Sequence, residues 1–123
     1  MERIFFSLGA GLAALSVSIG AFGAHGATKF MGDDQLRWIA KGASYQMYHA
    51  LALLAVAWAL TYWLKQAKLL KASGWLFVAG TLFFSGSLYI MALTGINLGY
   101  VTPLGGVAYV AGWIGLGVAA WRT

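Results

Sequence analysis

The fold is decided by residues 72–121, which read ASGWLFVAGTLFFSGSLYIMALTGINLGYVTPLGGVAYVAGWIGLGVAAW and contain no charged side chain. These 50 residues are too many for one membrane-spanning helix and enough for two, because about 20 helical residues cross a hydrocarbon core. The break falls at residues 95–100, before Thr102, which can cap a helix, and Pro103, which suits its first turn. We therefore predict two spans here, over residues 73–94 and 103–121.

Two more uncharged runs precede this stretch. They hold 25 residues between Arg3 and Lys29 and 23 residues between Lys41 and Lys65, so each fits one span. The first run is longer than a signal-peptide core, and we expect it to be retained as a helix. The sequence thus predicts a single four-span domain over residues 1–123, an all-α integral membrane four-helix bundle with up-down topology and its first spans at residues 4–24 and 43–64.

The composition indicates lipid as the solvent. Hydrophobic residues make up 61% of the chain and charged residues only 9%, against about 25% in soluble domains. The net charge of +5 comes from Lys and Arg at the ends of the apolar runs, with no basic stripe, so we expect the lipid bilayer and no nucleic acid as a partner. The chain has no cysteine, which excludes disulfides and thiolate metal sites.

The distribution of cations predicts the orientation. With four spans, both termini share one side with the second loop, and that side carries five cations: Arg3, Lys65, Lys68, Lys71 and Arg122. The other side has three cations, partly offset by Asp33 and Asp34. The excess of Lys and Arg predicts that both termini are cytoplasmic. In the first loop, Asp33 and Asp34 resemble a helix start and Trp38 suits the interface, so we expect a short interfacial helical segment there that runs into the second span.

Small residues mark the expected helix contacts, because close approach of backbones drives association in lipid. Two small flanks run along the first span, and we call Gly9, Ala13, Ser16, Gly20 and Gly23 the first flank and Gly11, Ala14, Ser18, Ala21 and His25 the second flank. We expect this helix to be the most enclosed. Its bulky stripe, formed by Leu8, Leu12, Leu15, Ile19 and Phe22, should face lipid or an oligomer partner. Similar seams occur in the last two spans, at Ser73, Gly80, Ser87 and Thr94 and at Gly105, Ala108, Gly112, Gly115 and Ala119.

Polar residues inside the spans are the candidate site. His49 lies about 9 Å inside the outer boundary of the second span, and three polar residues of the other spans fall at similar depths, roughly 9–11 Å: Ser18, Ser87 and Tyr109. Gln46 lies one turn above His49, and His25 lies at the mouth. An ionisable residue at this depth is a functional candidate. The structural alternative is a neutral His49 bonded to Tyr or Ser across the helices. We expect His49 to lie near Tyr89 or Ser87 of the third span and near Ser18 or Tyr109 of the other spans.

Catalytic and metal chemistry find little support. No acidic residue lies inside a span, so carboxylate pairs are absent, and two histidines without cysteine make a poor zinc site. We predict no catalytic residue, no metal and no cofactor. Haem held by His25 and His49 is the remaining alternative.

Several segments taken together resemble a known family. They are GAFGAHG at residues 20–26, YQMYHALA at 45–52, GSLY at 86–89, TPLGG at 102–106 and the Gly112-Trp113 pair. In this order they resemble the membrane family catalogued as domain of unknown function 423, akin to transmembrane protein 256. The resemblance implies a small multi-span protein, in the bacterial inner (plasma) membrane in most relatives, without an established activity.

The sequence leaves two classes of function open. One is a non-enzymatic protein that acts by association, as a homo-oligomer or as an accessory subunit of a membrane complex. The other is binding or transport of a small molecule, lipid or cofactor at the polar layer around His49. A layer filled by protein side chains would favour the first class, and a bound ligand between the helices would favour the second.

Overall fold

The computed structural model describes all 123 residues, and it is all-helical. Its elements are α1 (Glu2–Ala24), the 3₁₀ turn η1 (Gly26–Lys29), α2 (Asp33–Tyr62), the 3₁₀ turn η2 (Leu64–Gln66), α3 (Ala67–Gly80), the π-helical segment η3 (Thr81–Ser85), α4 (Gly86–Thr94) and α5 (Thr102–Arg122). Because α3, η3 and α4 follow one another without a break, the chain forms four long helices. The predicted all-α class is confirmed.

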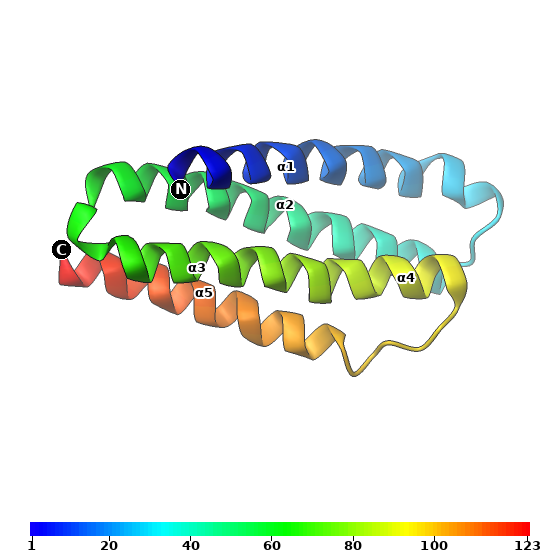
Figure 1. The fold of residues 1–123 in the computed structure, drawn as a ribbon. Helices are drawn as coiled ribbons and strands as arrows, with labels where there is room; N and C mark the ends of the chain where they lie inside the picture. The colour runs from blue at the N-terminus through cyan, green and yellow to red at the C-terminus, as the bar shows by residue number, and fades with distance from the viewer.

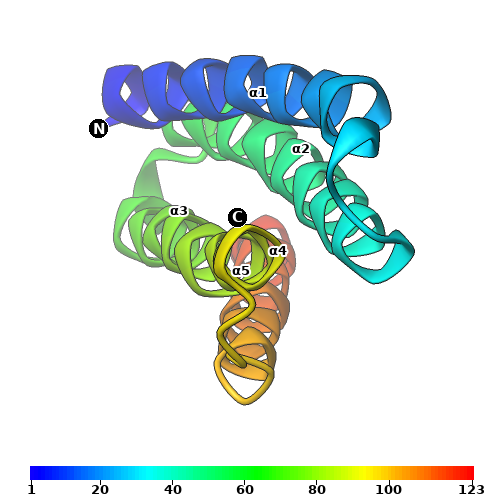
Figure 2. The same ribbon diagram turned by 90° about the vertical axis from the view of Figure 1, so that its right-hand side faces the viewer.

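The long helices lie side by side, with α1 and α5 on opposite outer sides and α2 and α3–α4 between them (Figure 2). Both termini lie at the same end as the α2–α3 connection, and the other two connections lie at the opposite end (Figure 1). Three stretches are long and apolar enough to cross a membrane: Glu2–Lys29, Leu64–Thr94 and Thr102–Arg122. The second helix is the exception, since polar side chains such as Gln46 and His49 interrupt its apolar stretch.

The helix pair α1–α2 is joined through the first flank. A Cβ atom on Gly9 would lie 2.7 Å from the carbonyl oxygen of Ala50, so the two backbones are in direct contact there. The Ser16 hydroxyl donates a hydrogen bond to the carbonyl oxygen of Ala43. Near the far end, a Cβ atom on Gly23 would lie 2.7 Å from Ile39 Cγ2. Small side chains along this face therefore set the separation of the two helices.

The expectation that the first helix is the most enclosed is wrong. Only Phe5, Gly9 and Ser16 of α1 are buried, whereas twelve residues of α2 are. The second flank is exposed along its length, and nothing lies within 4 Å of a Cβ placed on Gly11. The reason is positional: α1 is an outer helix, so its own chain covers only one of its two small flanks.

The helical segment expected in the first loop is continuous with the second long helix. Residues from Asp33 onward form the first turns of α2, which continues unbroken to Tyr62. The helix start is closed by Gln35, whose side-chain oxygen accepts a hydrogen bond from the Gly32 N–H at 2.7 Å. Acidic Asp33 and Asp34 in the first turn also favour a start here. Gly42 lies inside this helix and is buried, with the ring of Tyr89 packed against its backbone.

The predicted break in the long apolar run is confirmed at Gly95. This residue has φ of +75°, a left-handed conformation that glycine adopts without strain and that ends α4. Pro103 lies in the first turn of α5, as expected. Thr102 is the first helical residue instead of the cap, and its side chain makes no capping bond.

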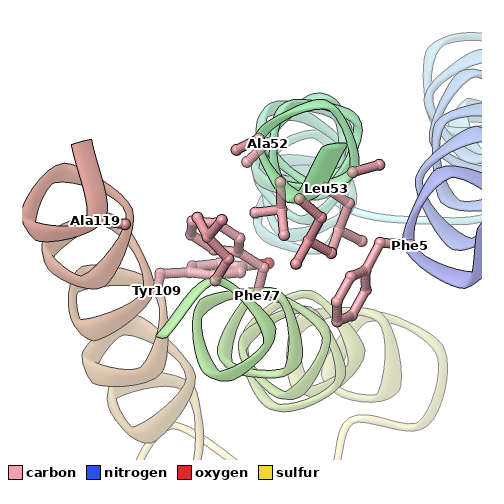
Figure 3. Close-up of a cluster of buried hydrophobic side chains, with 11 residues drawn as sticks. Phe5, Ala52, Leu53, Phe77, Tyr109 and Ala119 are labelled. Carbon is pink, nitrogen blue, oxygen red and sulfur yellow. The ribbon is translucent and has the colours of Figure 1, made fainter. Parts of the chain in front are cut away.

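The last two long helices pack through rings set against glycines. A Cβ atom on Gly112 of α5 would lie 2.7 Å from Phe77 Cε1, and a Cβ on Gly80 would collide with the ring of Tyr109. Phe77 and Tyr109 belong to the same buried cluster as Phe5, into which α1, α2, α3 and α5 all contribute side chains (Figure 3). Gly80, Gly112 and Gly115 of the predicted small-residue seams therefore lie in the α3–α5 contact, whereas Thr94 is exposed.

Two glycines of α1 give a matched test of this packing. Gly9→Ala should destabilise the protein by about 1–3 kcal/mol, because the new methyl group meets the Ala50 carbonyl, which cannot move away. Gly11→Ala should be neutral or stabilising by up to about 1 kcal/mol, since it gains helix propensity in open space. Unfolding of both variants in one detergent, followed by circular dichroism, measures the difference. Equal stability of the two variants would contradict the contact.

Candidate functional site

His49 lies in the middle of α2 and is 5% exposed. Its Nδ1 atom is 2.6 Å from the carbonyl oxygen of Tyr45, and its Nε2 atom is 3.0 Å from the indole Nε1 of Trp113 on α5. An indole N–H can only donate, so Nε2 must accept and Nδ1 must carry the hydrogen that the Tyr45 carbonyl receives. The two bonds thus assign a neutral imidazole with its hydrogen on Nδ1, and both ring nitrogens are satisfied.

Aromatic rings fill the space around this imidazole. The ring of Tyr109 stacks on it with a centroid distance of 3.4 Å and an interplanar angle of 6°. The rings of Phe77, Trp113 and Tyr45 follow at 5.7, 5.8 and 6.4 Å. Tyr109 reaches from α5 toward the centre of the bundle (Figure 3). The surroundings of His49 are therefore protein side chains, contributed by α2, α3 and α5.

The π-helical segment η3 is held from two sides. Tyr109 donates its hydroxyl hydrogen to Thr81 Oγ1 at 3.0 Å, and Thr81 in turn donates to the carbonyl oxygen of Phe77 at 2.9 Å. At the other end of the segment, Ser85 donates to the Gly42 carbonyl of α2 at 2.8 Å. Single π turns inside α-helices are frequent at functional sites. Here the segment connects α5 with α2.

A second polar group joins three helices. Tyr89 of α4 donates its hydroxyl hydrogen to Gln46 Oε1 at 2.7 Å, and Gln46 Nε2 donates to the carbonyl oxygen of Leu12 in α1 at 2.8 Å. The Tyr89 ring is seated on Gly42, where a Cβ atom would lie 2.6 Å from Cε1. Both the oxygen and the nitrogen of the Gln46 side-chain amide are therefore hydrogen-bonded within the protein.

The structure places the predicted polar residues in separate groups, not in one layer. It brings His49 to Tyr109 and Gln46 to Tyr89. Ser87 bonds to Thr102 Oγ1 at 2.6 Å, at the start of α5. Ser18 is exposed and bonds only to the Ala14 carbonyl of its own helix, and His25 is exposed just beyond α1. The depth calculation gives the height of a residue in the membrane but not the direction in which its helix presents it.

Trp113, Thr81 and Ser85 were not among the predicted site residues. Trp113 lies one turn beyond Tyr109 on α5, so the two share a face, and its indole N–H requires an acceptor when it packs inside. That spacing is the signal that could have identified it. The hydroxyls of Thr81 and Ser85 gave no such signal, because their roles depend on the π turn.

The two histidines are not arranged as a pair. His25 follows the last residue of α1, whereas His49 lies sixteen residues into α2, about 24 Å along the axis from its start. His49 Nε2 already accepts the indole hydrogen of Trp113, so an iron ligand there would have to displace that bond. The residues present do not fit a haem held between His25 and His49.

These features define a small helical membrane protein whose buried polar side chains bond mainly to backbone carbonyls and to polar side chains of the same chain. The family described as "Protein of unknown function (DUF423)" matches residues 19–106, and the chain belongs to this family. It is 47% identical to the UPF0382 membrane protein YwdK of Bacillus subtilis (strain 168), with 96% of each chain covered.

Further relatives come from other bacteria. The UPF0382 membrane protein SAB0533 of Staphylococcus aureus (strain bovine RF122 / ET3-1) is 44% identical over 98% of this chain and 97% of its own. The UPF0382 inner membrane protein YgdD of Escherichia coli (strain K12) is 41% identical, covering 86% of this chain and 80% of its own. No solved structure matches the chain.

The His49–Trp113 bond can be tested with a double-mutant cycle. His49→Phe leaves the indole N–H without an acceptor, and Trp113→Phe leaves Nε2 without a donor, so each single change should cost about 1–3 kcal/mol. The double variant should be more stable than the sum of the single effects by about 0.6 kcal/mol, and by up to about 1.7. Equilibrium unfolding in mixed detergent micelles measures the four free energies. Strictly additive effects would show that the bond contributes nothing.

Proposed function

We propose that all four long helices cross the membrane, in up-down order, with both termini cytoplasmic. The argument for α2 is that its interrupting polar side chains, Gln46 and His49, are buried and bonded to other parts of the chain. A helix whose polar groups are satisfied inside the bundle can cross the hydrocarbon core, because the cost of unsatisfied groups in lipid is avoided. Its position between α1 and α3–α4 supports the same embedding (Figure 2).

Single cysteines test this topology without background, since the chain has no cysteine of its own. A cysteine at Leu98, between α4 and α5, should react with a membrane-impermeant maleimide added to intact cells. A cysteine at Lys68, beside η2, should react only after the cells are opened. The reverse pattern would overturn the orientation, and labelling of both sites in intact cells would overturn the embedding.

We further propose that the protein is not an enzyme and acts by association in the membrane, as a homo-oligomer or as an accessory subunit. One observation supports this proposal. The first flank of α1 packs against α2, whereas the second flank is exposed. In lipid a row of small residues contributes little unless another helix approaches it closely. The second flank is therefore assigned as the contact surface for a partner helix.

The alternative function, binding or transport at His49, has less support. Aromatic side chains surround the imidazole, and its two nitrogens are bonded to Tyr45 and Trp113. A ligand would have to displace one of these groups. The protein-filled surroundings favour a structural role for His49 and leave the outer surface for function.

Disulfide crosslinking in native membranes tests the association. Ala14→Cys, on the second flank, should give a crosslinked dimer, or a crosslink to a different membrane protein recognisable by its mass. The control is Val110→Cys on α5, which is equally in the middle of its helix and exposed. Crosslinking at position 110 that equals or exceeds crosslinking at position 14 would reject the second flank as the contact surface.

A further inference from the structure

A groove lies between the first turns of α1 and the last turns of α2. It has a volume of about 540 Å³ and is lined by Phe6, Leu54, Ala57 and Trp58, with Glu2, Arg3, Ser7 and Thr61 adding polar atoms. The groove opens to the outside, since Phe6 and Trp58 are 56% and 55% exposed. Its volume lies within the range of about 300–1,000 Å³ that small-molecule sites occupy.

The groove runs from the membrane interface into one leaflet. Its lining on α2 extends from Thr61, next to the helix end, to Leu54, which is about 10 Å along the axis. One leaflet of the hydrocarbon core is about 15 Å thick, so the groove covers the two thirds of this leaflet that lie nearest its headgroups. Arg3 and Thr61 therefore lie at the depth of the headgroups, and Leu54 and Ser7 lie at the depth of the acyl chains.

The charge at the mouth of the groove is positive. Glu2 forms an ion pair with the amino group of Met1 at 3.6 Å, whereas Arg3 has no acidic partner. The connection that follows α2 lies at the same end of the molecule and carries Lys65 and Lys68 (Figure 1). No further acidic residue occurs at this end, because the other two, Asp33 and Asp34, begin α2 at the opposite end.

Aromatic residues anchor the same end in the interface. The Trp58 ring stacks on Tyr62 with a centroid distance of 5.2 Å and meets Trp63 edge to face at 5.7 Å. Trp and Tyr are enriched at the headgroup level of membrane proteins. Trp58, which forms one wall of the groove, therefore lies at the depth of the glycerol and phosphate groups.

We propose that this groove binds one phospholipid with an anionic headgroup. Its phosphate accepts hydrogen bonds from the Arg3 guanidinium, and one acyl chain lies over Phe6 and Leu54. The apolar floor, the unpaired cation at the mouth and the leaflet depth all match this occupant. The site requires the proposed embedding of α1 and α2 but not the association of chains.

Native mass spectrometry of the full-length protein in detergent tests the proposal. The probes are palmitoyl-oleoyl phosphatidylglycerol and palmitoyl-oleoyl phosphatidylcholine, which have the same acyl chains and differ in net charge. The wild-type protein should retain one phosphatidylglycerol about fivefold more strongly than phosphatidylcholine, in line with the attraction of one Arg for an anionic lipid surface. Free inorganic phosphate should not displace the lipid, because it lacks the acyl chain.

Two pairs of variants localise the site. Arg3→Gln should remove the preference for phosphatidylglycerol, whereas Arg122→Gln, with the same loss of charge at the same end of the molecule, should keep it. Ser7→Phe should fill the groove and weaken retention of both lipids, whereas Val17→Phe, exposed elsewhere on α1, should not. Both aromatic variants alter exposed positions, and circular dichroism checks that they fold.

The outcomes are distinct. Loss of preference in Arg3→Gln together with loss of retention in Ser7→Phe supports the site. Equal loss in Arg3→Gln and Arg122→Gln would show a general attraction to a basic surface and overturn the specific site. Equal retention of the two lipids by the wild type, or displacement by free phosphate, would also overturn it. Cysteine labelling reports the embedding separately, so failure of the lipid site and failure of the topology are distinguishable.

Discussion

Aromatic rings packed against glycines of other helices are the contacts on which the polar groups of this protein depend. Water does not drive helices together inside a bilayer, because lipid tails are as apolar as the side chains they would replace. Association must come from close packing and from hydrogen bonds within the bundle. The structure supplies the packing by seating a ring on a glycine in an adjacent helix at four places: Phe5 on Gly74, Tyr89 on Gly42, Tyr109 on Gly80 and Phe77 on Gly112.

The polar groups follow from these contacts. Seating the Tyr89 ring on Gly42 carries its hydroxyl to Gln46, and seating Tyr109 on Gly80 carries its hydroxyl to Thr81 and its face to His49. Each bond adds little net stability, since such interactions average about 0.6 kcal/mol in membranes. Their importance lies in the penalty they avoid, because an unsatisfied polar group in lipid costs several kcal/mol. The packing therefore decides which polar residues can be tolerated inside.

Local features allowed the last residues of α1 and α4 to be predicted, whereas α2 and α3 begin several residues before the predicted spans and the partners of the helices could not be predicted. The limits of the apolar runs can be recognised from the sequence alone, because charges mark them at Arg3, Lys65 and Lys71 and a glycine marks the break at Gly95. The first flank was recognised as a packing surface by its small residues alone. Its pairing with α2, and the absence of any neighbour at Gly11, depend on which helix lies where.

The candidate site was predictable to the same extent. His49 stood out because an ionisable residue inside a span needs partners, and depth placed Tyr109 at the same height. Depth could not reveal that Ser18 faces away from the bundle, because that depends on the rotation of α1. The π turn was also beyond sequence reasoning, since residues 81–85 contain nothing that forbids an ordinary α-helix. Within this segment, Thr81 and Ser85 donate hydrogen bonds to the carbonyl oxygens of Phe77 and Gly42.

The two surfaces assigned on α1 meet, and this links their proposed occupants. Ser7 lines the groove, and Gly11 begins the second flank one turn further along the same face. A lipid chain in the groove would therefore lie beside a helix packed on the second flank and form part of the surface that the helix meets. Binding free energies at adjacent sites are reciprocal, so a lipid that strengthens association is itself bound more tightly in the assembly. Clashing occupants would weaken each other by the same factor. If both proposed occupants bind, the composition of the surrounding membrane would act directly on the association, through the first three turns of α1.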